Sequence, residues 1–148
     1  MSATGLRQFD ETLQITNTWL KEIMTECGWE DRQTAYRALR ATLHALRDRL
    51  SIELVAHLAS QMPLLVRGMY YEGWRPSSQA EPAHNRTEFL APIADAFSRD
   101  ANARPDMIAG AVFKVLRMHV SEGELANVLQ ALPKQLRLIL DPEQAVSP

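Results

Sequence analysis

The sequence has almost no cysteine, no long apolar run and no recognisable targeting segment. Its single cysteine, Cys27, cannot form an internal disulfide, and one sulfur alone cannot build a zinc site. No stretch approaches the ~20 apolar residues needed to cross a bilayer. The opening MSATGLRQFDET has neither the basic start nor the apolar core of a signal peptide. These absences predict a cytoplasmic protein that does not enter membranes.

Catalytic and cofactor-binding spacings are absent as well. The six glycines are scattered and form none of the motifs that cradle phosphates or expose a nucleophilic serine. No two of His44, His57, His84 and His119 have the spacing that places two metal ligands on one helical turn. We therefore expect no cofactor and no metal, and we favour a non-enzymatic role.

The sequence does contain an internal repeat. Residues 19–70 align with residues 89–140 at a constant offset of 70 and without a gap. The identical pairs include Leu20 and Leu90, Ile23 and Ile93, Ala41 and Ala111, Leu46 and Leu116, Arg47 and Arg117, Ser51 and Ser121, Pro63 and Pro133, and Arg67 and Arg137. Such a duplication fixes the architecture before any motif is considered.

Apolar residues recur at steps of three and four almost throughout, which is typical of helices. The first helix is predicted over residues 6–26 and ends at Gly28. Its apolar stripe comprises Leu6, Phe9, Leu13, Leu20, Ile23 and Cys27. The second is predicted over residues 31–49. Its buried face comprises Tyr36, Leu39, Leu43, Leu46 and Leu50, beside alanines 38, 41 and 45.

Serine and proline mark two shorter helices in each copy. Ser51 and Ser121 are predicted N-caps, and Ser121 forms a capping box with Glu124. Pro63 and Pro133 are each predicted to start a fourth helix. Each copy therefore contains two long helices followed by two short ones.

The predicted fold is all-α: a tandem duplication of a four-helix unit, about eight helices, packed as one helical-bundle domain. The first repeat covers residues 6–72 and the second residues 88–140, joined by a Pro- and Ser-containing linker over residues 73–87. Residues 141–148 are expected to form a frayed tail. Pro92 lies inside the first helix of the second copy, which we expect to be kinked or to begin late.

The densest polar chemistry is in the predicted second helix, where His44, Arg47 and Asp48 lie close together. A functional interpretation makes them an anion-binding or proton-transfer cluster. In a structural interpretation, Asp48 pairs with His44 along the helix and Arg47 bonds the carbonyl end of a neighbouring helix. Arg117 repeats only Arg47 in the second copy, so we favour the structural interpretation.

A second cluster, Tyr70, Tyr71, Trp74 and Arg75, stands at the end of the predicted fourth helix of the first copy. Aromatic and arginine side chains are common anchors of interfaces. Packing between the copies is the favoured interpretation, followed by a surface for a partner or self-association, and then by a small-ligand site.

The second helix also carries five arginines, which raises the question of phosphate contacts. They are Arg32, Arg37, Arg40, Arg47 and Arg49. The whole chain has a formal charge of −2, so it has no general attraction to nucleic acid. A solvated arginine face is therefore the favoured interpretation over nucleic-acid binding.

The segment from Leu39 to Leu50, with the Gln61–Pro63 step and the Tyr70–Trp74 ending, resembles the bacterial family of unknown function numbered 2267. The resemblance extends from about Thr18 to Asp141 and includes the weaker second copy. It implies an all-helical, two-copy protein. It transfers no activity and no catalytic residues.

Three hypotheses follow. The leading one is a non-enzymatic module that binds a protein partner, or a second copy of itself, through the surface from Tyr70 to Arg75. The alternative is a small-molecule or anion receptor, or an unusual enzyme, with His44, Arg47 and Asp48 in a pocket between the repeats. Weak nucleic-acid binding is third.

Overall fold

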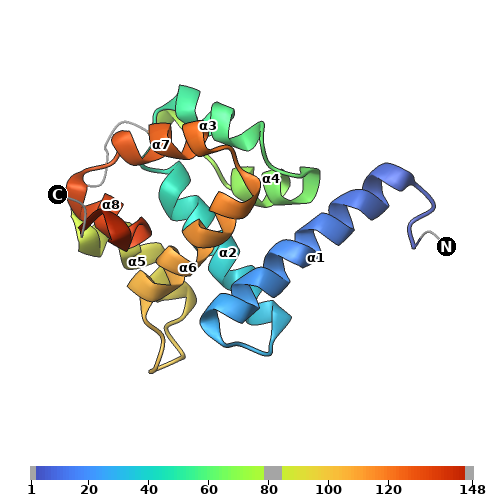
Figure 1. Cartoon of the computed structure of the whole chain (residues 1–148), viewed down its shortest axis with the longest axis horizontal. Helices are drawn as coiled ribbons and strands as arrows, with labels where there is room; N and C mark the ends of the chain where they lie inside the picture. Colours follow the sequence, from blue (N-terminus) through green and yellow to red (C-terminus); the bar gives the residue numbers. More distant parts are fainter. Residues whose placement is uncertain (1–2, 79–84, 146–148) are drawn as a thin grey trace.

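The computed structural model describes residues 3–78 and 85–145. The chain folds into eight α-helices and two short 3-10 turns over these residues, with no strand (Figure 1). The first half contains α1 (Arg7–Cys27), α2 (Arg32–Arg47), α3 (Ile52–Ala59), α4 (Leu64–Tyr71) and η1 (Pro76–Ser78). The second contains α5 (Arg86–Ala96), α6 (Pro105–His119), α7 (Glu122–Gln130), α8 (Lys134–Leu140) and η2 (Pro142–Ala145). The all-α prediction is confirmed.

The helix boundaries follow the sequence repeat. The third helices begin at residues 52 and 122 and the fourth helices at residues 64 and 134, so both pairs keep the offset of 70. The first helices differ, because α1 has 21 residues and α5 has only 11. Pro92 lies inside α5, which begins late as the sequence predicts. The described helix α5 therefore begins at the position that Thr16 holds in α1.

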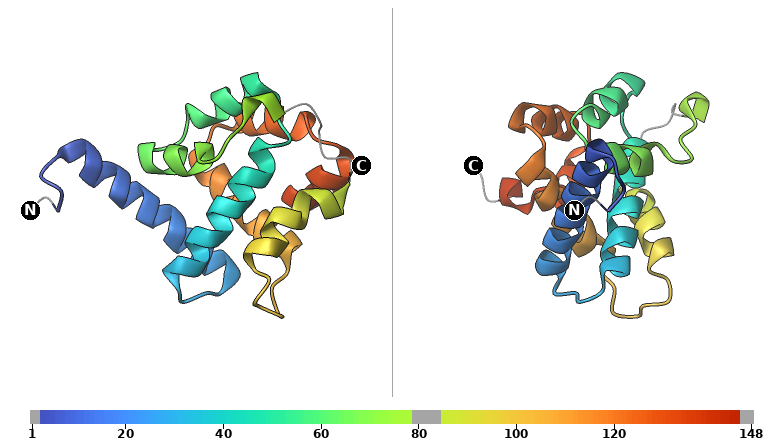
Figure 2. Two further views of the ribbon diagram at one scale, coloured as in Figure 1. Left: turned by 180° about the vertical axis from the view of Figure 1, so that it is seen from behind. Right: turned by 90° about the vertical axis from the view of Figure 1, so that its right-hand side faces the viewer.

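The two halves interlock instead of forming separate bundles. The first helix of each half packs on the second helix of both halves: α1 on α2 and α6, and α5 on α6 and α2. The second helices also pack on each other, as do α3 and α7, which lie side by side at one end of the molecule (Figure 1, Figure 2). One shared core results, and its largest buried side chains come from both halves: Trp19, Tyr70, Phe89 and Phe113.

The second helix, α2, is central to this core because α1, α4, α5 and α6 all pack against it. Its predicted face is buried at Leu39, Leu43 and Leu46, and the small residues beside that face are buried too. These are Ala35, Ala38, Ala41 and Ala45. Their small side chains let neighbouring helices approach closely on several sides.

The predicted caps are present, with one correction. Ser51 Oγ accepts the backbone N–H of Leu54, and Ser121 Oγ accepts that of Glu124. The predicted reciprocal bond of the capping box, from the backbone N–H of Ser121 to the Glu124 side chain, is wrong. That N–H donates to Gln61 Oε1 at 2.7 Å instead, and Gln61 Nε2 donates to Ser121 Oγ at 3.1 Å. A side chain of the first half thus completes a helix cap in the second.

The linker and tail are described only in part, because residues 79–84 and 146–148, with His84 among them, lie outside the described residues. The described part of the linker includes the turn η1. The expectation of a frayed tail does not hold for residues 141–145. Asp141 is buried and accepts a bond from Arg117 at 2.7 Å, and the turn η2 follows it.

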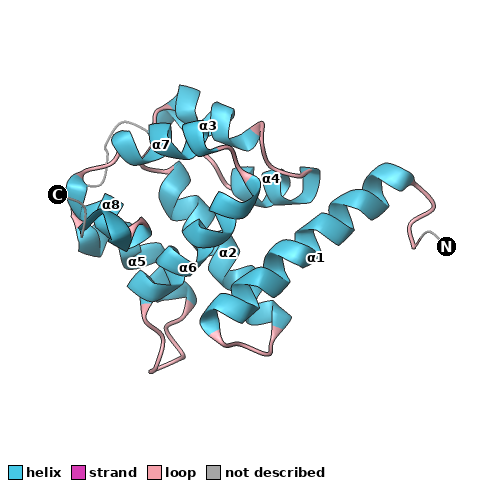
Figure 3. Ribbon diagram, viewed as in Figure 1, coloured by secondary structure: helices cyan, strands magenta, loops and turns pink. Residues whose placement is uncertain are grey.

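Figure 3 shows helices joined by loops over the described part of the chain. None of these described helices combines the length and the apolar character that crossing a membrane requires. The same residues contain no cluster of three or more His, Cys, Asp and Glu side chains that could hold a metal ion.

Leu43 and Leu46 are fully buried in the shared core. Replacing either with alanine removes apolar surface and leaves a cavity, so we expect each variant to lose about 2–5 kcal/mol of unfolding free energy. Urea unfolding followed by circular dichroism measures this loss. A change as small as that of Met118→Ala, an exposed residue of α6, would contradict the assigned burial.

Candidate functional site

The N-terminal half of α1 projects from the rest of the molecule (Figure 1, Figure 2). The predicted apolar stripe of α1 has the expected spacing, but only its later part is buried. The body covers Leu20 and Ile23, whereas Leu6, Phe9 and Leu13 are 45%, 49% and 39% exposed. Since the first residues of α1 extend past the other helices, the front of the stripe is left uncovered.

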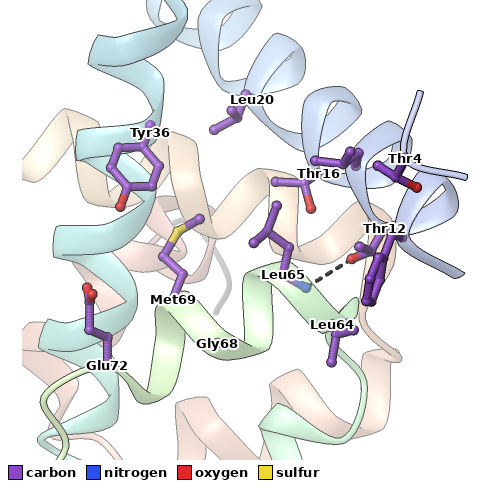
Figure 4. Close-up of a pocket in the computed structure, with 12 residues that line it drawn as sticks. Thr4, Thr12, Thr16, Leu20, Tyr36, Leu64, Leu65, Gly68, Met69 and Glu72 are labelled. Atoms are coloured by element: carbon purple, nitrogen blue, oxygen red, sulfur yellow. Dashed lines mark hydrogen bonds between the residues drawn. The ribbon is translucent and has the colours of Figure 1, made fainter. Parts of the chain in front are cut away.

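The uncovered stripe borders an apolar groove between α1 and α4, closed at one end by α2 (Figure 4). The groove has a volume of about 810 Å³. Its apolar lining includes Phe9, Leu13 and Leu20 of α1, Leu64, Leu65 and Met69 of α4, and Tyr36 of α2. Leu64 and Leu65 are 54% and 42% exposed, so both walls present large apolar side chains to solvent.

A hydrogen bond between the walls holds the groove. Pro63 precedes α4 and supplies no side-chain cap, so the first N–H groups of α4 need another partner. Thr12 of α1 provides it, because its hydroxyl oxygen accepts the backbone N–H of Leu65 at 2.9 Å (Figure 4). This bond fixes α4 against the projecting helix.

Two features suggest that the groove has room and a polar anchor for an occupant. Thr16 Oγ1 is buried at the groove and has no hydrogen-bond partner among the described residues, and in Figure 4 its hydroxyl points toward α4. A buried unpaired hydroxyl costs about 1–3 kcal/mol, which an occupant could recover. Gly68 leaves free space on the α4 side of the groove, because a Cβ atom at this position would have no atom within 4 Å.

The equivalent place in the second half is chemically different. A cavity of about 510 Å³ lies between α6 and α8, but charged residues line it. They are Glu26, Arg86, Asp106, Lys114, Arg117, Asp141 and Glu143. Asp106 stands where Tyr36 lies in the first half, and Leu138 stands where Gly68 leaves space. The two equivalent cavities are thus unlike, and the large apolar groove belongs to the first half.

His44, Arg47 and Asp48 lie together at the carbonyl end of α4, away from the groove. Arg47 is buried, and its Nη1 donates to the backbone oxygens of Tyr70 and Glu72 at 2.9 and 2.8 Å. The expected helix-end role of Arg47 is confirmed. The predicted pairing of Asp48 with His44 is wrong: Asp48 Oδ1 accepts from Arg47 Nε at 2.8 Å, while His44 Nε2 lies 2.8 Å from the Met69 carbonyl oxygen.

The environment of His44 favours its neutral form. Burial lowers its pKa from the ordinary value, and the nearby charges of Arg47 and Arg40 lower it further. The bond to Met69 and the carboxylate of Asp48 act in the opposite direction. Because a carbonyl oxygen only accepts, the proton of the neutral ring is on Nε2, which donates to Met69. The His44 ring thus joins α2 to α4 through this hydrogen bond.

The aromatic cluster is partly internal. Tyr70 is fully buried, and its hydroxyl donates to the Val55 carbonyl oxygen at 3.1 Å. Burial also raises the pKa of Tyr70. Tyr71 lies between Tyr70 and Trp74, with ring centroids 5.4 Å from each. Tyr71 and Trp74 are half-buried and Arg75 is exposed, so only these three reach the surface.

Most arginines of α2 and its end are held by the protein's own groups. Arg37 lies over the Phe97 ring at 5.4 Å, Arg40 pairs with Glu72 at 2.7 Å, and Arg49 donates to the Glu88 carbonyl oxygen at 3.5 Å. Arg47 donates to carbonyl oxygens at the end of α4, so four of the five arginines contact other groups of this chain. They do not line up as a phosphate-binding face.

Cys27 at the end of α1 is half-buried. Burial, assisted by the neighbouring charge of Glu26, raises the pKa of this thiol to about 11. A thiol with such a pKa is protonated near neutral pH and is a poor nucleophile. Cys27 therefore fits the structural role that its position on the apolar stripe predicts.

A comparison with family models identifies the class of protein. Residues 16–139 match the family described as "Uncharacterized conserved protein (DUF2267)", so the chain belongs to this family. A search of curated proteins gave no match. The matched span includes α2, α4 and the second half but begins at residue 16, so Leu6, Phe9 and Leu13 precede it.

Arg47 and Arg40 form a matched pair for testing the helix-end bonds. Arg47→Met leaves the buried carbonyl of Tyr70 and the part-buried carbonyl of Glu72 without their charged donor, so we expect a loss of about 2–5 kcal/mol in unfolding free energy. Arg40→Met removes only an exposed ion pair and should change stability little. Urea unfolding compares the two, and equal losses would refute the assigned role of Arg47.

The lowered pKa of His44 predicts a pH dependence of stability. Because the folded state disfavours the charged ring, the unfolded chain binds more protons below the ordinary pKa of 6.5. The contribution of His44 is therefore complete above that value and is lost as the pH falls below it. Unfolding free energies measured between about pH 7.5 and 5.5 should decline less for His44→Gln than for the wild type. Parallel curves would contradict the prediction.

Proposed function

We propose that this protein is a non-enzymatic interaction module that binds an apolar helix of a protein partner in the groove between α1 and α4. The observation that carries the proposal is the groove of about 810 Å³ beside large exposed apolar side chains on both walls. Exposed apolar patches of this kind are uncommon on monomers unless they bind something. We also propose that the protein acts in the bacterial cytoplasm, in keeping with its single cysteine and its family resemblance.

The shape and chemistry of the groove favour a helix as the occupant. Its walls are two helices side by side, and a third helix with an apolar face can lie between them. The groove supplies few polar groups, so the partner face should be apolar at steps of three and four. Thr12 and Thr16 offer hydroxyl groups along the α1 wall. An occupant with small polar side chains between its apolar residues would suit them.

The surface inferred from sequence remains a second place for partner contact, reduced to Tyr71, Trp74 and Arg75. The rings of Tyr71 and Trp74 already pack on each other in a tilted arrangement, so they expose less apolar area than separate anchors would. We therefore rank this surface behind the groove. The anion-receptor hypothesis has less support, because His44, Arg47 and Asp48 are engaged with α4 or with each other and do not line the groove.

An apolar small molecule is a second candidate for the groove. The volume of about 810 Å³ lies within the range of ligand pockets, roughly 300–1,000 Å³. The unpartnered hydroxyl of Thr16 favours a molecule with one hydrogen-bonding group. A straight-chain alcohol such as 1-decanol represents this class.

Gly68 and Gly123 provide a matched test, because both lie in helices and a Cβ at either meets nothing within 4 Å. Gly68→Gln places a polar side chain in the groove, so partner binding should be lost. Gly123→Gln on α7 should bind normally. Both variants should be at least as stable as the wild type, since helical glycine costs about 1 kcal/mol. Partners captured by cross-linking are identified and their binding reconstituted from purified proteins.

The proposal requires a reconstituted partner that binds the wild type and Gly123→Gln but not Gly68→Gln. If no captured protein shows this dependence and the chain does not self-associate through the groove, the proposal is wrong. Thermal stabilisation of the wild type, but not of Gly68→Gln, by 1-decanol would then support the small-molecule candidate.

A further inference from the structure

We propose that the groove is filled by α1 of a second copy of this chain, so that the protein forms a symmetric dimer through paired α1–α4 surfaces. The inference deepens the proposed function and rests on it, because it names the partner helix. It is carried by three observations on the front of α1: the spacing of its apolar stripe, the placement of its charges, and the position of the exposed stripe beside the groove.

The stripe of α1 has the spacing of a seam between paired helices. Leu6, Phe9, Leu13, Thr16, Leu20, Ile23 and Cys27 alternate steps of three and four without interruption. A strict alternation of this kind is the pattern of helices that pack lengthwise on a second helix. The body of the protein covers only the later part of the seam, and the exposed front continues it in register. The unfilled front thus fits a second helix.

The front of α1 also needs support. Short helical segments without tertiary packing are marginal in water, because most helical stability in proteins comes from a buried face. α4 holds this segment through the bond from Leu65 to Thr12, but its apolar side chains remain exposed. A second copy packed on this face would cover them. The helix would then gain the buried face that its sequence provides.

The charges on the front of α1 allow this surface to pack against the same surface of a second copy. Residues 12–20 contain no charged side chain. Nearer the start of the helix, Arg7 Nε pairs with Glu11 Oε1 at 2.8 Å, and Asp10 accepts bonds from the backbone N–H and hydroxyl of Thr4. The charges flanking the stripe are therefore satisfied within one copy. Two such surfaces can meet without placing like charges against each other.

A second copy fills more of this surface than an unrelated helix would. Each copy carries both a ridge, the exposed apolar edge formed by Leu6, Phe9 and Leu13, and the groove that Phe9 and Leu13 of this ridge also line. About a two-fold axis, the ridge of each copy can enter the groove of the other, which is the self-complementary contact of symmetric dimers. The hydroxyls and amides of the uncharged stretch, such as Gln14 and Asn17, are groups that the unpartnered hydroxyl of Thr16 can bond.

Sedimentation velocity of the full chain over about 1–500 µM tests the dimer. The wild type should approach twice the monomer mass as the concentration rises. Leu13→Glu on the ridge and Gly68→Gln in the groove should each weaken association by about thirtyfold or more, the scale of an interface hot spot. Met118→Glu is the matched control for the first variant, because Met118 is 51% exposed on α6 and should leave the dimer intact. Gly123→Gln is the control for the second.

Hydrogen exchange locates the contact, and circular dichroism confirms that each variant is folded. Amides of residues 7–15 and of the first turn of α4 should become more protected at high protein concentration, whereas those around Met118 should not change. A wild type that stays monomeric over the whole range would overturn the dimer. So would a dimer that persists in folded Leu13→Glu and Gly68→Gln variants.

Failure of the dimer can be distinguished from failure of the proposed function. A monomer that binds a reconstituted partner, with binding lost in Gly68→Gln but kept in Gly123→Gln, overturns the dimer and retains the interaction module. A monomer without such a partner overturns both. A dimer that dissociates in Leu13→Glu and Gly68→Gln, with protection at residues 7–15, supports both.

Discussion

The structure depends on the first helices, α1 and α5, because each packs on the second helices of both halves. α2 is buried on several sides, and its own half supplies only α1 and α4 to cover it, so α5 and α6 of the other half must complete the shell. The reciprocal contacts of α1 with α6 and of α5 with α2 meet this need. Neither four-helix unit has a complete core alone. The chain is therefore a duplication that folds as one unit, and Gln61 strengthens it by capping a helix of the other half.

Residues that the two copies share build the scaffold, whereas positions at which the copies differ create the groove. Pro63 and Pro133 start equivalent helices, and Arg67 binds the carbonyl oxygens of Ala59 and Met62 at the end of α3. In contrast, Gly68 becomes Leu138 in the second half, and α5 begins only at Arg86, the counterpart of Thr16 inside α1. One open apolar groove and one charged cavity result from the same backbone plan. The loss of symmetry is thus concentrated at the candidate site.

Sequence reasoning predicted the scaffold well and the site only in part. The repeat, the caps at Ser51 and Ser121, and the buried face of α2 follow from local patterns that act within a few residues. The partner of His44 could not be predicted in this way, because it is the carbonyl of Met69, 25 positions away on another helix. The stripe of α1 was found, but periodicity specifies which face is apolar and not how far along the helix other elements cover it.

The two halves of α1 carry different constraints, and this division explains how a binding surface can coexist with a stable core. Trp19 and Ile23 are fully buried, so changes there act on folding. Phe9 and Leu13 line the groove and are 49% and 39% exposed, so changes there alter the groove surface more than the core. Thr12 joins the two regions, because its bond to Leu65 holds α4 to the projecting segment. The front can therefore vary in sequence while the shared core stays intact, and the family match, which begins at residue 16, covers the core half of the helix.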